Sequence, residues 1–374
     1  MQTILHIIRK EFLQLRRDPR MFPILFLAPI AQFIFLGYAA NLDVKSIPFV
    51  VHDQDRTKTS RDFITQYANS EYFSLVDNCD YMDQVDDWID QSKANLAILI
   101  PRGFEQDLLS GETTELQIIS DGAEANSATI GLNYAGMIAL RYSQQIILKK
   151  LQRIGYSRTT AIDFQPRIWY NPELKSRYFM IPGILALLLM VMTMILTSLG
   201  IVKEKEIGTM EQLIVTPIKS YQLILGKLFP FVIIGVIDII MVVTLSILWF
   251  DIAIKGSIIL LFLLSFAFLL TTLGLGLFIS TISRTQQQAM MTSIFFFMMP
   301  MMFFSGFIFP IENMPKIIQG ISYLLPLRYY FVIIRGIYLK GAGILELWDE
   351  TGALLLFGLM IMTLSIIKFH KKLD

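Results

Sequence analysis

Residues 203–227 read KEKEIGTMEQLIVTPIKSYQLILGK, a polar stretch between two long apolar segments. The flanking segments, 178–202 and 228–250, are each long enough to cross a hydrocarbon core of about 30 Å at a rise of about 1.5 Å per residue. The charges between them would cost about 2.5–3.5 kcal/mol each at the centre of a bilayer, so the stretch must lie in water. Its basic residues are close to the membrane ends and predict a cytoplasmic loop: Lys203, Lys205, Lys219 and Lys227.

The middle of this stretch has the pattern of a short amphipathic helix. Apolar residues at helical spacing face one way and polar residues the other: Ile207, Met210, Leu213 and Ile214 against Glu211 and Gln212. Gly208-Thr209 would start the helix with Thr209 as its N-cap, and Pro217 would end it, because proline disfavours helical geometry in the residue before it. On physical grounds alone, a helix that docks on a partner and a helix that lies on the lipid surface are both open.

Two segments resemble the ABC-2 type transport permeases, which are the membrane subunits of ATP-driven exporters. The first is 203–227, quoted above, and the second is SYLLPLRYYFVIIRGIYLKG at 322–341. The resemblance extends over essentially the whole chain. It implies that 203–227 carries a coupling helix, which docks on a separate ATPase subunit where ATP and Mg²⁺ are bound.

The composition is that of a membrane protein with one sizeable polar portion. Of the 374 residues, 54% are hydrophobic and 17% are charged, and the mean hydropathy is +0.55. The net charge of +1 excludes a basic surface for nucleic acid on overall charge grounds. The single cysteine, Cys79, cannot form an intramolecular disulfide, so we expect a small buried thiol, with an intermolecular bridge as the alternative.

Residues 1–18 predict a cytoplasmic amphipathic helix in the plane of the membrane interface. Its apolar face carries Ile4, Ile7, Ile8, Phe12 and Leu15, and its basic face carries Arg9, Lys10, Arg16 and Arg17. It would be an elbow helix that contacts headgroups and the ATPase, or only a positively charged anchor. Residues 21–40 then form an apolar run that is too long for a signal-peptide core of about 7–15 residues, so we expect an uncleaved first span with the N-terminus in the cytoplasm.

The composition changes completely in 41–177, where strand and helix patterns alternate. The expected strands are 47–51, 73–76, 94–101 and 116–120, and the expected helices are 59–68, 82–91, 103–110 and 125–154. This alternation predicts an α/β domain inserted between the first and second spans. Long loops cross membranes largely regardless of charge, so the alternation of spans places the domain outside the cytoplasm.

Acidic residues at two strand ends could suggest a metal or phosphate site. Asp53, Asp55 and Arg56 follow the first strand, and Asp121-Gly122 follows the last. Such residues are more often turn formers and helix caps, which is the interpretation we favour. The resemblance implies that this domain handles substrate or docks a partner and performs no chemistry.

The sequence predicts an α-helical polytopic membrane protein with six spans. After 21–40 and 178–202, four further spans are expected at 228–250, 258–280, 289–309 and 352–367. Gly274 and Gly276 would let a neighbouring helix approach the fourth span closely. Lysines after the last span place the C-terminus in the cytoplasm.

The segment 310–349 is expected to be an outer re-entrant element before the last span. Its apolar part, 322–339, is interrupted by Pro326, and Arg328 and Arg335 share one helical face. Irregular backbone at membrane depth is tolerated where protein buries it. The resemblance implies such an element at this place.

Two features of the spans suggest a translocation path. Asp238 falls near the middle of 228–250, where an ionised carboxylate is expensive, so it should face protein or water. It would serve translocation or proton coupling, or make a buried hydrogen bond between helices. In the fifth span, Phe297, Met298 and Met301 would give an adaptable apolar wall for bulky ligands, or be ordinary core and lipid-facing residues.

The sequence carries no enzyme motif. HExxH, GxSxG and CxxC do not occur, and His6, His52 and His370 are scattered outside the spans. The phosphate loop G-x-x-x-x-G-K-[ST] is also missing, since Gly226-Lys227 is followed by leucine and lacks the upstream glycine. We therefore expect no cofactor in this chain, and an energy source in another chain.

The main hypothesis is a permease subunit of an ABC-2 exporter in a bacterial plasma (inner) membrane. Its expected partners are the ATPase, a second permease copy or paralogue, a periplasmic adaptor and the bilayer. The coupling candidates are Glu204, Glu206, Gly208, Thr209, Glu211 and Gln212. The glutamates would pair with basic residues of the ATPase.

The apolar fifth span and the resemblance favour a hydrophobic small molecule or drug as the substrate. One alternative is a non-transporting anchor or sensor whose outer domain recruits a partner. Another is a secondary transporter, although only Asp238 is acidic within a span interior.

Overall fold

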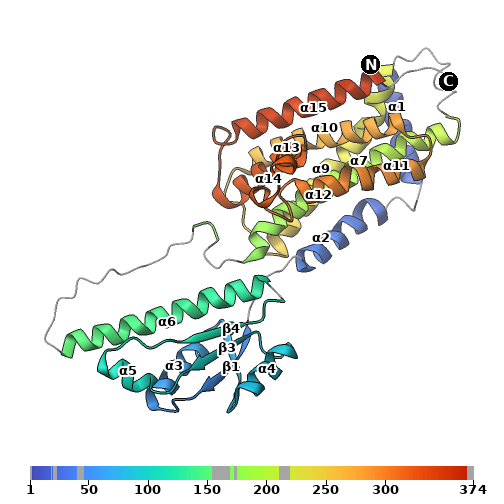
Figure 1. Cartoon of the computed structure of the whole chain (residues 1–374). Coiled ribbons are helices and arrows are strands. Elements are labelled where there is room, and N and C mark those ends of the chain that lie inside the picture. Colours follow the sequence, from blue (N-terminus) through green and yellow to red (C-terminus); the bar gives the residue numbers. More distant parts are fainter. Residues whose placement is uncertain are drawn as a thin grey trace. The chain divides into compact units, whose positions relative to one another are not determined.

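The computed structural model describes residues 2–17, 19, 23–39, 46–123, 125–153, 169–171, 175–209 and 220–368. These residues divide into two units. One is helical and contains Met1–Leu42 and Arg167–Asp374, and the other, Asp43–Pro166, contains the sheet (Figure 1).

The Asp43–Pro166 unit is a four-stranded mixed sheet covered on both faces. Its strands are β1 (Ile47–Asp53), β2 (Phe73–Asn78), β3 (Leu96–Ile100) and β4 (Gln117–Ser120), in the order β2-β1-β3-β4. Strand β1 is parallel to β2 and β3, and β4 is antiparallel to β3. Helices α3 (Lys58–Ala68), α5 (Phe104–Ser110) and α6 (Ala125–Arg153) pack on one face, and α4 (Met82–Asp90) packs on the other.

The eight elements expected in this unit are all present. A connection between parallel strands is almost always a right-handed crossover. Along the sheet, the chain runs from β1 to β2 in one direction and from β2 to β3 in the other. Right-handedness therefore puts α3 and α4 on opposite faces, as observed. Thr57 caps α3 through the hydroxyl that accepts the Ser60 N–H at 3.2 Å, and the fully buried Phe49 and Tyr67 fill the core between sheet and helix.

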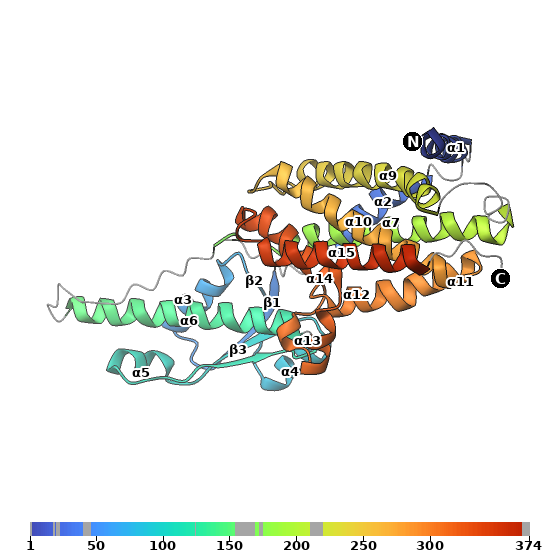
Figure 2. The ribbon, with the colours of Figure 1, turned by 90° about the horizontal axis from the view of Figure 1, so that it is seen from above.

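The other unit is a bundle of helices with α10 at its centre (Figure 2). Its elements are α1 (Gln2–Arg17), the π-helix η1 (Pro23–Leu27), α2 (Ala28–Ala39), α7 (Ser176–Glu206), α9 (Ser220–Leu248), α10 (Ile258–Ile282), α11 (Gln286–Thr292), the π-helix η2 (Ser293–Met298), α12 (Met299–Phe304), the 3-10 helix η3 (Ile311–Asn313), α13 (Lys316–Ser322), α14 (Pro326–Arg335), the π-helix η4 (Gly336–Lys340) and α15 (Trp348–Lys368). Helix α10 packs against α7, α9, α14 and α15.

Five described helical segments are long and apolar enough to cross a membrane: Ser176–Glu206, Tyr221–Leu248, Ile258–Ile282, Gln286–Phe304 and Trp348–Lys368. Lys316–Ser322 and Pro326–Lys340 pass this test only as a pair, and they are bent by 80°. Within the expected first span, the described apolar helix is shorter, Leu25–Ala39. A multi-pass membrane protein is therefore confirmed, and the count of six spans stays a prediction.

The helices that flank the polar stretch are longer than expected. Helix α7 continues to Glu206 and α9 already begins at Ser220, so the connection is shorter than the predicted 203–227 loop. Gly208, with φ of +80°, ends α7, because its N–H bonds to the Lys205 carbonyl at 3.2 Å in the left-handed geometry that glycine tolerates. The predicted coupling helix, with Thr209 as its N-cap and its end at Pro217, lies beyond its cap in 210–219, outside the described residues.

The two glycines in the middle of α10 lie at close approaches of neighbouring helices, as the sequence predicts. A Cβ atom at Gly276 would lie 2.6 Å from the Met194 carbonyl oxygen of α7. At Gly274 the nearest atom would be Ile361 Cγ2 of α15 at 3.3 Å. Hydrogen bonds reinforce both contacts: one joins the Thr193 and Thr272 hydroxyls at 2.6 Å, and the other runs from the Ser365 hydroxyl to the Gly274 carbonyl at 3.0 Å.

We expect Gly276→Ala to destabilise the bundle by about 1–3 kcal/mol, because the new methyl group would meet backbone that cannot move aside. Gly274→Ala is the matched control, since its methyl group would need only a small shift of the Ile361 side chain. Thermal unfolding of both purified variants in the same detergent measures the difference. Equal melting temperatures for the two variants would contradict the close contact between α10 and α7.

Candidate functional site

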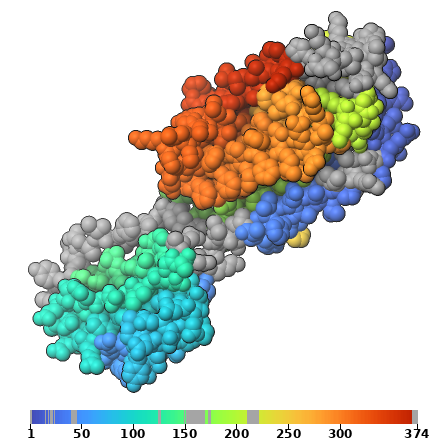
Figure 3. Space-filling view, turned by 45° about the vertical axis from the view of Figure 1, so that its right-hand side comes forward, coloured from blue at the N-terminus to red at the C-terminus, as the bar shows by residue number. Residues whose placement is uncertain are grey.

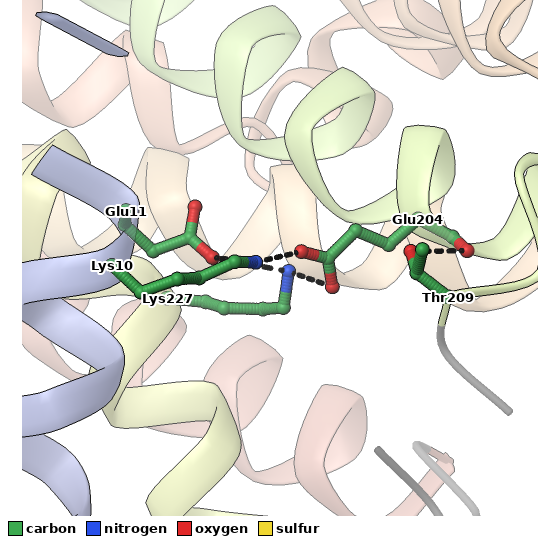
Figure 4. Close-up of polar contacts among 5 residues, drawn as sticks. All are labelled: Lys10, Glu11, Glu204, Thr209 and Lys227. Atoms are coloured by element: carbon green, nitrogen blue, oxygen red, sulfur yellow. Dashed lines mark hydrogen bonds and ion pairs between the residues drawn. The ribbon is translucent and has the colours of Figure 1, made fainter. Parts of the chain in front are cut away.

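Four charged side chains meet where α1 reaches the facing ends of α7 and α9 (Figure 4). Lys10 Nζ donates to Glu204 Oε1 at 2.5 Å, and Lys227 Nζ forms an ion pair with the other oxygen of Glu204. Glu11 Oε1 lies 3.0 Å from Lys10 Nζ and 3.6 Å from Lys227 Nζ. Two lysines and two glutamates thus form a neutral group, which we call the ion-pair cluster.

The centre of the ion-pair cluster is buried. The side chains of Lys227 and Glu204 are only 3% and 8% exposed. Charges in such places are tolerated only when they are paired and hydrogen-bonded. Burial by itself would lower the pKa of Lys10, but its hydrogen bonds to Glu204 and Glu11 outweigh this and raise its pKa above the ordinary value.

Apolar packing fixes α1 at the same place. Ile7 is buried, and a Cβ atom at Gly226 of α9 would lie 2.7 Å from Ile7 Cγ2. Glycine at 226 therefore allows α1 to approach α9 closely. Part of the apolar face that the sequence assigned to the membrane interface is used for this contact with α9.

The last turn of α7 is also tied to α10 and α11. Lys205 Nζ donates to the Ser280 carbonyl at the end of α10. The exposed Glu206 carboxylate accepts from the backbone N–H of Gln286 at 3.1 Å and from its side-chain amide at 2.8 Å. The end of α7 is thus connected to four other helices: α1, α9, α10 and α11.

The structure brings together only some of the predicted coupling residues. The Thr209 hydroxyl donates to the Glu204 carbonyl at 3.2 Å, next to Gly208. Both carboxylate oxygens of Glu204 face lysines of this chain, and its expected ion pair with an ATPase stays a prediction. Glu211 and Gln212 lie outside the described residues, and the coupling role of the whole set stays a prediction.

Sequence reasoning missed three members of the ion-pair cluster as site residues. Lys227 was assigned only to the membrane end, and Lys10 only to the basic face of the first helix. Glu11 is an isolated acidic residue on a helix that otherwise carries basic charges, and this was the one local signal of an internal partner.

Asp238 is buried between α9, α2 and α7. Its side chain is 4% exposed and lines a space of about 10 Å³ with Pro29, Leu185 and Met192. This is roughly the room that a single water molecule needs. Within the described part of the chain neither carboxylate oxygen has a hydrogen-bond partner, so the interhelical hydrogen bond proposed from the sequence is not formed there.

The predicted apolar wall of the fifth span faces its own chain in part. Met301 is buried, and Phe297 and Met298 are half-buried against the core of the bundle. The exposed side chains of this span include Phe295 and Phe296, in the π-helix that precedes Pro300. Figure 3 shows the surface of this region in orange, beside α15 in red. A translocation role for Phe297, Met298 and Met301 stays a prediction.

The acidic residues at the strand ends are turn formers, as we favoured. The Asp53 carboxylate accepts from the N–H groups of Asp55 and Arg56, both at 3.0 Å. Burial alone would raise the pKa of Asp55, but its hydrogen bonds from the Thr57 hydroxyl at 2.6 Å and from backbone N–H groups near Gly103 lower it. Among the described residues no group of three or more His, Cys, Asp or Glu side chains could hold a metal ion.

The fold and the ion-pair cluster define a multi-pass helical membrane protein that also carries an α/β unit. The sequence profile of the ABC-2 family transporter proteins matches residues 19–367. The chain belongs to this family, as the resemblance predicted, and membership implies association with an ABC ATPase subunit.

Curated relatives match the chain from end to end. It is 32% identical over 366 residues to the probable multidrug ABC transporter permease YbhR of Escherichia coli K12, covering 98% of each chain. It is 31% identical over 366 residues to the probable multidrug ABC transporter permease YbhS of the same strain, covering 98% of this chain and 96% of YbhS. The linearmycin resistance permease protein LnrN of Bacillus subtilis is 23% identical, with 96% of each chain covered.

Replacing Lys227 by Met should destabilise the protein by about 3–5 kcal/mol, because it leaves the buried Glu204 and the partly buried Glu11 with only the half-exposed Lys10. Adding Glu204→Gln to this variant should restore much of the loss, since it removes one unpaired charge. Thermal unfolding of the wild type, both single variants and the double variant gives the coupling energy. If the loss of stability in the double variant equals the sum of the losses in the two single variants, Lys227 and Glu204 are not coupled.

Asp238→Leu should leave the melting temperature unchanged or raise it, because the carboxylate has no hydrogen bond to lose and its surroundings are apolar. Asp238→Asn keeps a polar group at this position and should therefore raise the melting temperature less than Asp238→Leu. Thermal unfolding in detergent measures both. A loss as large as that of Lys227→Met would show that Asp238 has a partner in the folded protein.

Proposed function

We propose that this chain is the membrane-spanning permease subunit of an ABC-2 exporter in the plasma (inner) membrane, which moves a hydrophobic small molecule or drug outward. A separate ATPase docked on 203–227 would bind ATP and Mg²⁺ and supply the energy. The observation that carries the proposal is the ion-pair cluster, which joins α1 to both helices that flank this stretch. The names of the relatives YbhR and YbhS support the substrate class.

The described contacts offer a route for motion through the bundle. A displacement of the segment between Glu206 and Ser220 acts directly on α7 and α9, because the segment is covalently joined to both. Separating α7 from α9 would leave buried charges unpaired, which is costly, so the two ends move together. Helix α7 then acts on α10 at Gly276, and α10 acts on α15 at Gly274.

The proposed orientation places 203–227 and both termini in the cytoplasm, with 21–40 as the first of six spans and the α/β domain outside. The basic residues at the ends of the spans support it. The pair α13 and α14 would be the outer re-entrant element. Its Arg335 stacks on Phe179 at 3.6 Å and donates to the Gly306 carbonyl at 3.2 Å, and such protein contacts are what polar groups need at membrane depth.

A second copy or a paralogue would complete the passage, and a periplasmic adaptor would dock on the α/β domain. The fourth of the membrane-crossing segments, Gln286–Phe304, and the last, Trp348–Lys368, are each only 17% buried within this chain. These two segments therefore have the apolar surface that a partner permease requires, with lipid covering the remainder.

Ile207→Glu tests the docking of the ATPase. Ile207 is 62% exposed directly after α7, so the substitution should not disturb the bundle. Burying its unpaired charge at the contact should weaken co-purification with the ATPase about tenfold or more and reduce ATP-dependent export.

Leu345→Glu is the matched control, because Leu345 is 86% exposed between η4 and α15, at the other end of α10. It should leave co-purification unchanged. If no ATPase co-purifies with the wild type and export needs no ATP, the proposal is overturned. Export without ATP would then favour the secondary transporter, and the absence of any export would favour the anchor or sensor.

A further inference from the structure

The α/β unit has an open pocket between α6 and the segment that joins α5 to β4. Its volume is about 540 Å³, within the range of roughly 300–1,000 Å³ that is common for small-molecule sites. Most of its lining is apolar and comes from several elements: Phe63, Phe104, Leu108, Leu116, Tyr142 and Ile146. All the residues that line the pocket belong to this unit.

Gly136 gives the pocket part of its depth. It lies inside the 29-residue helix α6, where glycine costs up to about 1 kcal/mol relative to alanine. A Cβ atom at Gly136 would meet nothing within 4 Å, so no packing contact requires glycine there. The missing side chain instead enlarges the space that the pocket offers.

Polar groups with unused hydrogen-bonding capacity lie on the lining of the pocket. The Thr114 hydroxyl is buried and has no hydrogen-bond partner among the described residues. Lys150 also lines the pocket, and within the described ranges no carboxylate lies within ion-pair distance of its ammonium group. Glu112 is the one acidic residue in the lining; it is exposed, so water and salt screen its charge.

We propose that this pocket binds a small amphipathic molecule with an apolar body and an anionic head. The body would lie among Phe63, Phe104 and Ile146, and the head would accept hydrogen bonds from Lys150 and Thr114. A medium-chain carboxylate is the simplest compound of this class. The site goes beyond the proposed export function, because it lies in the α/β unit and needs no ATPase.

The test uses the full chain in lipid nanodiscs and a decanoate that carries a photoreactive diazirine. The wild type should be labelled saturably in peptides from 104–116 and 136–150, and unlabelled decanoate should compete. Gly136→Leu should reduce this labelling about tenfold, because the leucine occupies the pocket. Gln144→Leu adds the same side chain to α6 outside the lining and should keep full labelling.

Gly136→Leu should fold normally, since leucine has the higher helix propensity and has room there. Its melting temperature checks this. Lys150→Met gives a second, independent reading: it should weaken labelling by the decanoate probe and leave labelling by the matching decanol probe unchanged.

The proposal that this pocket binds the ligand is overturned if labelling does not saturate. It is also overturned if Gly136→Leu and Gln144→Leu affect labelling equally. If Lys150→Met affects labelling by the decanoate and decanol probes equally, the proposal that Lys150 binds an anionic head group is overturned. Because neither readout involves transport or ATP, failure here is distinguishable from failure of the proposed export function.

Discussion

The bundle depends on the pairing of one buried carboxylate, that of Glu204, with two lysines from distant parts of the chain. A charge in a weakly hydrated place is tolerated only with close partners, so α1, α7 and α9 have to meet at this point. The cluster is neutral as a whole, which limits the cost of burying it. Two of its members, Glu204 and Lys227, lie at the two ends of the polar stretch 203–227. Any force on that stretch acts first on the helices that these charges hold together.

Away from the ion-pair cluster, close packing between helices stabilises the bundle. Apolar side chains gain little by leaving lipid for another apolar surface, so membrane helices rely on small residues that let backbones touch and on hydrogen bonds between them. Helix α10 uses both, with Gly276 and the Thr193–Thr272 hydrogen bond toward α7, and Gly274 with Ser365 toward α15. These contacts continue the connection that starts at Glu204. A chain of rigid contacts therefore extends from the polar stretch to the last helix of the described structure.

Local patterns predicted the fold well and the candidate site poorly. The α/β elements were predictable because strand and helix periodicities are local, and Gly274 and Gly276 because small residues have a defined use between membrane helices. The end of α7 was placed too early, since Lys203 to Glu206 leave the apolar pattern yet are good helix formers. The partners of Glu204 were missed because Lys10 lies 194 residues away, and no local pattern signals such a pair. The π-helix before Pro300 shifts which side chains of the fifth span face outward, and hydropathy does not register such a shift.

Many buried polar groups in the two units are satisfied within the chain, and two of the unpaired ones lie at places described above. Asp53 and Asp55 are satisfied by backbone N–H groups and hydroxyls, and Glu204 is satisfied by lysines. Asp238 and Thr114 have no such partners among the described residues, although leaving a buried polar atom unpaired costs about 1–3 kcal/mol. Natural proteins keep such violations mainly where function requires them. Asp238 lies between α9, α2 and α7, and Thr114 lies in the lining of the α/β pocket. Each unit therefore carries a buried polar group whose missing partner a ligand, a proton or a moving helix would supply.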